Sequence, residues 1–580
     1  MLNKEQKEAA LSLNPAIVTA GPGSGKTKTL TERVSHLLRN KISPTEILCF
    51  TFTRSAATEM KERLEKKFNT SKLTITTIHA FCLNILRKNY HLLGYKEHII
   101  TYDDVDSNDL MSLIAAENNW IYKPKKPESS PDHKKILQEY NNRLKEYNAV
   151  NFEQMQNFVI MLLEQGKLEH IQHKYRYILV DEMQDTSDID YKLITLLGKF
   201  YHNVFAVGDI DQELFSFRGA NPYLIGEIEK FNENGYKVEL NKSYRCPQPV
   251  LDLCNKLSAT KLKSMTNCDI EPIFNVVDSQ EEECDWMIDM VETYQSDNVG
   301  ILCRTNRMIE FVSQYFSSKG FEHHVMGDQV KLIDRQSVRT FISFLKFWYN
   351  NNDYLSFYRI MPILHNNMPG REINTIKSKA IINDKSLLRM AESEGYDMSL
   401  FREGAFDMIK KAGKLLNSWY NQRAMTTKAM EISEFESEVE SWLEENPILG
   451  LDDYLYYISD MSVTAESHKE IEEHKINLMT VHASKGLEFD TVFIPQINHA
   501  IYKSGDRNVL FVAMSRTKKN LLMSYSKFAY LYGVEPKEVK PSVFLKDIEL
   551  TGPIKDKPKK HGLEDDDIMS AFNNVDKKNK

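Results

Sequence analysis

The sequence AGPGSGKT at residues 20–27 decides the fold of this chain. The apolar run AIVTA at residues 16–20 comes directly before it and predicts a strand. After it, Leu30, Val34 and Leu37 fall on one face of a helix at the 3.6-residue period. A strand, a glycine-rich turn and a helix together predict a phosphate-binding loop, in which backbone N–H groups and the helix N-terminus hold the phosphates. The alternative is an ordinary glycine-rich turn, and the strand and helix around the loop argue against it.

Two side chains of this loop carry its chemistry. Lys26 would reach the β- and γ-phosphates of a nucleotide, and the Thr27 hydroxyl would bind Mg²⁺. Ala20 stands where the strict motif has its first glycine. By itself the loop predicts only that the chain binds a nucleoside triphosphate.

An acidic segment narrows this interpretation. The short apolar run YILV at residues 177–180 is followed by DEMQD at residues 181–185. A carboxylate at the end of a strand can hold the Mg²⁺ shared with Thr27, and we assign Asp181 to that role. A second carboxylate beside it can orient or deprotonate the attacking water, and we assign Glu182 to that role. An acidic pair after a strand is usually a solvated turn, but the phosphate loop upstream favours the catalytic interpretation.

The composition limits the class of protein. With 580 residues the chain is too long for one ordinary core, so we expect several domains. The net charge of −8 gives no overall basic surface, so any contact with nucleic acid depends on a local groove. The 7 cysteines form no CxxC pair, which favours free thiols in a reducing compartment. The sequence shows no signal pattern and no apolar run long enough to span a bilayer, so we expect a cytoplasmic protein without a membrane partner.

The order of apolar and polar segments predicts the architecture. Short apolar runs alternate with amphipathic stretches in two regions, which predicts parallel β-sheets with helices around them. A polar segment with a mainly helical pattern interrupts each region, and the first of these segments shows no clear strand pattern. The predicted fold class is α/β, with two parallel-sheet domains that each contain a mainly helical insertion. The expected boundaries are residues 1–85 and 175–241 for the first domain, 86–174 for its insertion, 242–343 and 475–550 for the second domain, 344–474 for its insertion, and 551–580 for a flexible tail.

The tail combines an acidic run at residues 564–567 with a small apolar group, Ile568, Met569 and Phe572. We interpret it as a solvated, disordered segment. The alternative is a short helix that binds a protein partner.

Several more segments fall into a known order. The chain resembles superfamily 1 DNA helicases of the UvrD/PcrA/Rep family, and the resemblance covers the two α/β regions nearly end to end. This many motifs in the same order do not arise by chance. The segments that carry the resemblance are Leu2-Asn3 with Gln6, FTFTRSAATEM at 50–60, TIHAF at 77–81, VDEMQDTS at 180–187, GDIDQELFSFRGA at 208–220, LNKSYRC at 240–246, TVHASKGLEFDTVFI at 480–494 and LFVAMSRTKKNL at 510–521.

The resemblance implies a P-loop NTPase in which two RecA-like domains hold ATP and Mg²⁺ between them. Gln212 would sense the γ-phosphate, and Arg245 and Arg516 would act as arginine fingers, because a guanidinium stabilises the charge that spreads over the γ-phosphoryl oxygens. The implied catalytic residues are Lys26, Glu182, Gln212, Arg245 and Arg516, with Thr27 and Asp181 on the metal.

The nucleotide would be bound by residues on both sides of the cleft. Gln6 would read adenine, Tyr244 would stack on the base, and Glu488 would contact the ribose. The full set implied by the resemblance and the loop is Gln6, Ala20, Gly21, Pro22, Gly23, Ser24, Gly25, Lys26, Thr27, Lys28, Tyr244 and Glu488.

Single-stranded DNA would run across the tops of both domains, where stacking on aromatic rings gives sequence-tolerant binding. The alternative for each phenylalanine is a place in the core, and for Phe81 the two interpretations are evenly balanced. The candidates are Phe52, Phe81 and Phe217 for stacking, with His79, Arg218 and His482 as polar contacts.

Three positions differ from the residues that are usual in the family. Met183 and Phe215 stand where tyrosine is usual, and Phe217 stands where tryptophan is usual. Phenylalanine still stacks, but with less area than tryptophan and without a donor group. Both insertions also look shorter than in the housekeeping enzymes.

We therefore expect an ATP-dependent DNA helicase that moves 3′ to 5′ on single strands and separates tailed duplexes in replication, repair or recombination. The polarity comes from the resemblance alone. One alternative is a translocase that remodels or strips protein–DNA complexes with little unwinding. Another is a nucleotide-gated DNA-binding subunit that hydrolyses little ATP. RNA remains open as the track, since stacking surfaces accept both nucleic acids.

Overall fold

The computed structural model describes residues 2–548 except 13, 15, 97, 217–218, 234, 295, 297, 327–331, 366, 448, 465–475 and 532–534. The predicted tail at residues 551–580, and with it the predicted partner-binding helix, lies outside the described residues. In the described part of the chain no helix is both long enough and apolar enough to cross a membrane.

The first domain is built on a six-stranded sheet with the order β3-β2-β6-β7-β1-β8, in which every neighbouring pair is parallel. Its strands β1, β2, β6 and β7 read as almost continuous apolar runs because helices cover both faces of a parallel sheet. The strands are β1 (Ala16–Ala20), β2 (Ile47–Phe50), β3 (Thr74–Thr76), β6 (Tyr177–Val180), β7 (Val204–Gly208) and β8 (Tyr236–Leu240).

Helices pack on both faces of this sheet. Along β1, Ile17 points into one core, while Val18 points into the other, as the two-residue period of a strand requires. Leu30, Val34 and Leu37 of α2 fill the second core, as their spacing predicts. The helices are α1 (Lys4–Leu11), α2 (Lys26–Arg39), α3 (Arg54–Glu65), α4 (Ile78–Asn89), α7 (Phe152–Glu164), α8 (Glu169–Lys174), α9 (Asp188–Leu197) and α10 (Leu224–Phe231).

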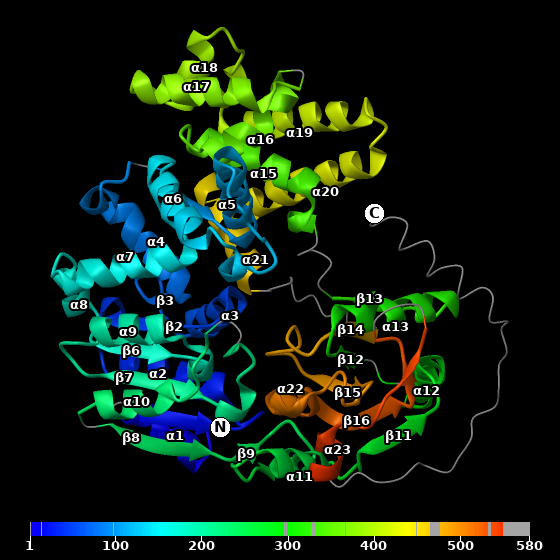
Figure 1. Ribbon diagram of the computed structural model, residues 1–580. Helices are drawn as coiled ribbons and strands as arrows, with labels where there is room; N and C mark the ends of the chain where they lie inside the picture. The colour runs from blue at the N-terminus through cyan, green and yellow to red at the C-terminus, as the bar shows by residue number, and fades with distance from the viewer. Residues whose placement is uncertain are drawn as a thin grey trace.

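The second domain repeats this plan. Its six-stranded sheet has the order β11-β16-β15-β12-β14-β13, again with parallel pairs throughout. Figure 1 shows the two sheets side by side, with α22 at the seam between them. The strands are β11 (Ile273–Val277), β12 (Val299–Cys303), β13 (His324–Val325), β14 (Ile476–Thr480), β15 (Phe489–Ile494) and β16 (Thr517–Ser526), and the helices are α11 (Gln248–Leu257), α12 (Gln280–Tyr294), α13 (Asn306–Ser318), α22 (Arg507–Met514) and α23 (Val543–Asp547).

The first insertion is mainly helical, as expected for residues 86–174, although α7 and α8 at its end pack into a core of the first domain. It contains a two-stranded parallel sheet, β4 (Ile100–Tyr102) with β5 (Ala149–Asn151), beside α5 (Asp104–Asn118) and α6 (His133–Glu146). Each strand has only three residues, too few to show an alternating pattern in the sequence.

The second insertion is helical, and its helix α15 begins ahead of the expected boundary at residue 344. That helix, α15, packs into the helical core, so residues 336–343 lie with the helices. The helices are α15 (Gln336–Tyr349), α16 (Tyr354–Leu364), α17 (Gly370–Ile382), α18 (Leu387–Ser393), α19 (Ala405–Asn421), α20 (Thr426–Glu445) and α21 (Leu451–Thr464).

The two insertions share a single hydrophobic core, although more than 150 residues separate them. Leu110 and Tyr140 of the first insertion belong to the same buried cluster as Phe341, Phe357 and Phe435 of the second. In Figure 1 these helices form one layer above the first sheet. We call this shared layer the helical unit.

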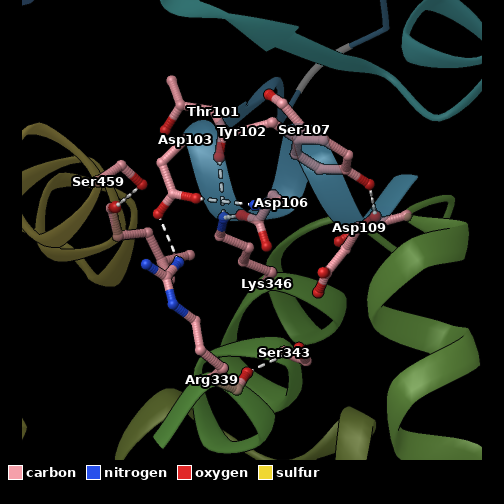
Figure 2. A network of polar contacts seen from close by, with 12 residues as sticks. Thr101, Tyr102, Asp103, Asp106, Ser107, Asp109, Arg339, Ser343, Lys346 and Ser459 are labelled. Atoms are coloured by element: carbon pink, nitrogen blue, oxygen red, sulfur yellow. Dashed lines mark hydrogen bonds and ion pairs between the residues drawn. The ribbon is translucent and has the colours of Figure 1, made fainter. Parts of the chain in front are cut away.

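A buried network of charges crosses the interface inside the helical unit (Figure 2). Lys346 of α15 forms an ion pair with Asp106 of α5 and donates to the Thr101 carbonyl at 2.9 Å. Both charged side chains are 2% exposed. Arg359 of α16 pairs with the other oxygen of Asp106 at 2.7 Å, and Arg339 pairs with Asp103. Burial raises the pKa of Asp106, but these cations outweigh it and hold that pKa well below its usual range.

The second insertion also rests directly on the first domain. Arg87 of α4 pairs with Asp453 of α21 at 2.8 Å. The Arg54 guanidinium lies 4.3 Å from the ring centroid of Tyr456, which is itself part of a core of the first domain. The second insertion therefore interrupts the sequence of the second domain but packs against the first domain.

We expect the Asp106→Asn substitution to lower the free energy of unfolding of the helical unit by about 3–5 kcal/mol, because it leaves the Lys346 charge buried without a carboxylate. Four of the 5 tryptophans, Trp120, Trp348, Trp419 and Trp442, pack against this core, so urea unfolding followed by tryptophan fluorescence reports on it. The control is Asp109→Asn, which removes the 52% exposed partner of the same Arg359 and should cost at most about 1 kcal/mol. Equal losses from both substitutions would contradict the role given to the buried pair.

Candidate active site

The phosphate loop has the conformation that its glycines allow. Gly23 and Gly25 have φ angles of 68° and 83°, in the left-handed region that favours glycine. The Ser24 hydroxyl donates to the Gly21 carbonyl at 2.7 Å and closes the turn. Gly25 is the N-cap of α2 and provides no side-chain cap, so the first N–H groups of the helix are left for a phosphate. Ala20, Gly21 and Pro22 are buried at the base of the loop, and Lys28 is exposed on the first turn of α2.

The environment of Lys26 suits the binding of an anion. Its ammonium nitrogen is buried and makes no hydrogen bond within the described residues. Its charged neighbour is Glu182, whose Oε2 lies 3.5 Å away. A buried ammonium without hydrogen bonds is costly, and a phosphate oxygen would supply them.

Asp181 and Thr27 fit a magnesium ion. Thr27 Oγ1 donates to Asp181 Oδ2 at 3.5 Å, so both oxygens already face one point beside the loop. Hydroxyl and carboxylate oxygens are the ligands that Mg²⁺ takes beside substrate phosphates. Burial and the neighbouring Glu182 charge raise the pKa of Asp181 to about 7, and a dication at this point would favour its ionised form.

Glu182 is held in a strained, charged state. It follows β6 with φ of 50°, an uncommon value for a residue with a side chain. Burial raises the pKa of its carboxyl, but Lys26, Lys485 and the Gln184 amide outweigh burial and lower this pKa to about 2. An ionised carboxylate beside the phosphate loop can orient or accept a proton from water.

The second domain supplies a buried arginine to this cleft. Arg516 is 2% exposed, and its guanidinium donates to Gln212 Oε1 of the first domain at 3.3 Å. Its other acceptors are also neutral: the Val512 carbonyl at 3.1 Å, the Leu487 carbonyl at 3.4 Å and the Ser515 hydroxyl at 3.2 Å. Burial lowers the pKa of Arg516 to about 9. A buried guanidinium with neutral partners is a site for a phosphate oxygen.

Arg245 lies next to the phosphate loop and pairs with Glu488. Its Nε donates to Glu488 Oε2 at 2.7 Å, and its Nη1 donates to the Ser515 carbonyl at 3.3 Å. Glu488 also pairs with Lys518 at 2.8 Å. Both residues therefore sit at the cleft, and the Glu488 carboxylate holds the arginine in place in this structure.

Gln6 and Tyr244 lie beside the loop and share Asn3 as a hydrogen-bond partner. The Gln6 amide donates to the Ser24 carbonyl at 2.8 Å and accepts from the Asn3 N–H at 2.9 Å. Tyr244 is 48% exposed, and its hydroxyl accepts from Asn3 Nδ2 at 3.0 Å. An exposed aromatic ring beside a fixed amide suits a flat base, because one would stack on it and the other would read its edge.

An aromatic pair lies at the candidate DNA surface, with Phe52 partly exposed and Phe215 buried behind it at 6% exposed. The rings of Phe52 and Phe215 stack with centroids 4.8 Å apart, and His482 of the second domain lies 6.3 Å from Phe215. Lys485 places its ammonium 5.7 Å from the Phe52 centroid and 5.1 Å from that of Phe215. Both domains therefore contribute to this surface.

A cavity of 590 Å³ lies beside this pair. Its wall includes Phe52, His79 and Phe215 together with Asp181 and Glu182. The His79 ring also packs edge-on against Phe152, 5.2 Å away. The candidate DNA surface and the catalytic carboxylates thus open into one space.

Phe81 is a core residue, which corrects its assignment to DNA stacking. It is 4% exposed and packs edge-on against Phe50, with ring centroids 5.3 Å apart. A base could reach this ring only if the core opened. Phe217 and Arg218 lie outside the described residues.

Lys485 was missed by the sequence interpretation. It forms an ion pair across the cleft with Asp185 and donates to the Gln212 carbonyl at 3.2 Å. Its position in TVHASKG, beside His482, was the available signal. A lone lysine gives no sign of its partner in the other domain, and here that partner is 300 positions away.

Together these features define a class of protein. The first parallel sheet carries a phosphate loop and, on the next strand but one, an acidic pair. The second domain adds arginines to the cleft. This arrangement is that of a P-loop NTPase with two RecA-like domains.

Comparisons with known proteins identify the family. Residues 2–130 and 114–233 match the UvrD/REP helicase N-terminal domain, and residues 238–528 match the UvrD-like helicase C-terminal domain. The chain therefore belongs to the UvrD-like helicase family, whose members are ATP-dependent DNA helicases.

The chain is also similar to individual curated proteins. The ATP-dependent DNA helicase PcrA of Staphylococcus aureus (strain MRSA252) is 28% identical, and the alignment covers 94% of this chain and 86% of that protein. PcrA of Staphylococcus epidermidis (strain ATCC 12228) is 26% identical over the same shares. The similarity spans both domains and both insertions.

Replacing Gly23 by alanine should weaken nucleotide binding at least about tenfold. A Cβ atom there would lie 2.5 Å from Arg245 Cβ and 2.7 Å from Ser243 Oγ, so the loop or the segment 243–245 would have to move. Titration with a fluorescent ADP measures the affinity. Gly166→Ala is the control, since its φ of 71° is similar but nothing lies within 4 Å, and it should cost only about 1 kcal/mol of stability. Unchanged ADP affinity in Gly23→Ala would contradict this reading of the loop.

Proposed function

We propose that this protein is a motor that couples ATP hydrolysis to 3′-to-5′ movement on single-stranded DNA and to separation of duplex DNA. The observation that carries the proposal is Arg516, a buried cation of the second domain that faces Gln212 of the first with neutral hydrogen-bond partners. A γ-phosphate between Lys26 and Arg516 would balance charge on both sides of the cleft. Hydrolysis would remove that anion and weaken the contact between the domains.

The residues of the cleft divide the chemical work. Lys26 and the N-terminus of α2 hold the β- and γ-phosphates, while Glu182 orients the attacking water and accepts its proton. Arg516 and Arg245 stabilise charge on the γ-phosphoryl oxygens, and Gln212 senses the γ-phosphate. Mg²⁺, held by Thr27 and Asp181, would neutralise the β- and γ-phosphate oxygens. Gln6, Tyr244 and Glu488 bind the adenosine.

The DNA strand would lie against Phe52 of the first domain and His482 of the second, with the buried Phe215 ring supporting Phe52 from behind. Closing and opening the cleft would then shift one half of this surface against the other. The 3′-to-5′ direction is supported by the family alone, and so is a role in replication, repair or recombination.

We place the enzyme in the cytoplasm. All seven cysteines are free thiols in the structure, and six of them are buried, which suits a reducing compartment. Its partners would be single-stranded DNA and tailed duplexes, with a protein partner for the C-terminal tail as a further proposal.

The polarity experiment is ATP-driven unwinding of a duplex with either a 3′ or a 5′ single-stranded tail. We expect unwinding from the 3′ tail alone, and none with Lys26→Ala. DNA-stimulated ATPase without unwinding from either tail would replace the helicase proposal with a translocase that remodels protein–DNA complexes.

Glu182→Gln should abolish ATP turnover while ATP affinity stays within about threefold, because the amide keeps the shape but cannot accept the proton of water. Steady-state ATPase and equilibrium nucleotide binding measure the two effects. Loss of both in parallel would indicate a folding defect, and retained turnover would remove Glu182 from its role. Wild-type protein that binds ATP but does not turn it over would favour the nucleotide-gated subunit.

Phe52→Ala should weaken binding of a labelled oligo(dT) by about 1–3 kcal/mol, the usual value of one base stacked on an aromatic ring. Fluorescence anisotropy at one fixed salt concentration measures this, because salt changes every nucleic-acid affinity. The control is Phe200→Ala, which removes a 37% exposed ring that stacks on His173 elsewhere on the first domain. The assignment fails if both variants bind like the wild type.

A further inference from the structure

Gln184 is a buried amide directly behind the catalytic carboxylate. It lies in the short turn after β6 and is fully buried. Its Nε2 donates to Glu182 Oε2 at 2.6 Å and to Asp185 Oδ2 at 3.3 Å. Its Oε1 accepts from the Asp209 backbone N–H at 2.8 Å. The amide thus joins the acidic segment to the next loop of the sheet.

The end of β7 leaves room for this amide. A Cβ atom on Gly208 would lie 2.7 Å from Gln184 Oε1 and 3.3 Å from its backbone nitrogen. Any side chain at position 208 would push the amide away from Asp209. The neighbouring strand is therefore shaped around Gln184.

The hydrogen bonds continue from Asp209 to the second domain. Asp209 Oδ2 accepts from Gln212 Nε2, and Gln212 Oε1 accepts from Arg516 Nη2 at 3.3 Å. A continuous polar chain therefore runs from Glu182 through Gln184, Asp209 and Gln212 to Arg516. The links from Gln184 to Arg516 are buried, so water does not compete with them, while the Glu182 carboxylate at the end of the chain is 24% exposed.

We propose that Gln184 is a positioning residue that orients the Glu182 carboxylate and ties this orientation to the Gln212–Arg516 contact between the domains. The proposal rests on the proposed function, because it concerns the same hydrolysis. When Arg516 engages Gln212, the side chain of Gln212 is fixed against the Asp209 carboxylate. This fixes the loop whose Asp209 backbone N–H holds the Gln184 oxygen. The water-activating carboxylate is then correctly aimed only while the second domain is docked.

This arrangement explains how hydrolysis is timed to domain closure. Lys26 contacts the same Oε2 of Glu182 at 3.5 Å, but a single ion pair leaves a carboxylate free to rotate. The Gln184 amide adds a directional hydrogen bond and removes that freedom. Opening the cleft breaks the Arg516 end of the chain and releases the carboxylate at the other end.

The test uses Gln184→Met, which keeps the length and burial of the side chain but removes its hydrogen bonds. We expect kcat of the DNA-stimulated ATPase to fall at least about tenfold, the size of one lost hydrogen bond to a charged group, while KM for ATP and the affinity for fluorescent ADP stay within about threefold. The matched control is Gln172→Met. Gln172 is equally buried and bonds only the Leu196 carbonyl at 2.7 Å among the described residues, so its loss should leave kcat unchanged.

A double-mutant cycle then tests the chain itself. Gln212→Met should lower kcat, and adding Gln184→Met to it should lower kcat little further, because both substitutions break the same chain. If the two effects multiply, or if Gln184→Met leaves kcat intact, Gln184 does not connect Glu182 to the other domain. A rise in KM without a fall in kcat would equally overturn the proposal. Failure of the proposed function would look different, because the wild-type protein would then show no DNA-stimulated ATPase.

Discussion

The rest of the structure depends on the need to balance positive charge that is buried on both sides of the domain cleft. Among the described residues, Lys26 contributes a buried ammonium without hydrogen bonds, and Arg516 contributes a buried guanidinium whose acceptors are neutral. Burying a cation is costly, and an anion beside it lowers that cost. A triphosphate would balance the charge of both cations at once, so the bound nucleotide would control the contact between the domains.

The same seam carries the candidate DNA surface. Lys485 crosses from the second domain to pair with Asp185, and its ammonium lies against the Phe52 and Phe215 rings. A change in domain contact therefore moves charge beside the stacking surface. The candidate DNA surface and the catalytic carboxylates are close together, because Phe52 lines the same cavity as Asp181 and Glu182. No long-range relay is needed between them.

Patterns within short segments made much of this fold predictable. Strands such as 16–20, 47–50 and 177–180 are continuous apolar runs, because buried parallel strands have both faces covered. The phosphate loop and the acidic pair are also local, and the structure brings them within reach of each other. What sequence patterns could not show is pairing between distant segments. The edge strand β8 alternates buried and exposed residues over only five positions, and β4 and β5 are shorter still.

Individual residues show the same limit. Phe81 lies in a motif next to DNA-contacting text, and only its packing on Phe50 reveals that it belongs to the core. Gln184 stands between two carboxylates in sequence, and nothing in that text indicates that its oxygen reaches the backbone of Asp209. Likewise, the text of the second insertion gives no sign that Lys346 pairs with Asp106, because such long-range partners leave no periodic signal.

The shared core of the helical unit has a consequence for synthesis on the ribosome. The apolar residues of the first insertion, such as Leu110 and Tyr140, are covered by α15 and later helices that begin at Gln336. At roughly 5–20 residues per second, they emerge about 10–40 seconds before their partners. During that interval the apolar face of the nascent chain is uncovered. The Asp106 carboxylate, which is buried in the folded protein, also lacks the cations that pair with it. The apolar face of the first insertion therefore stays exposed until α15 and α16 leave the exit tunnel.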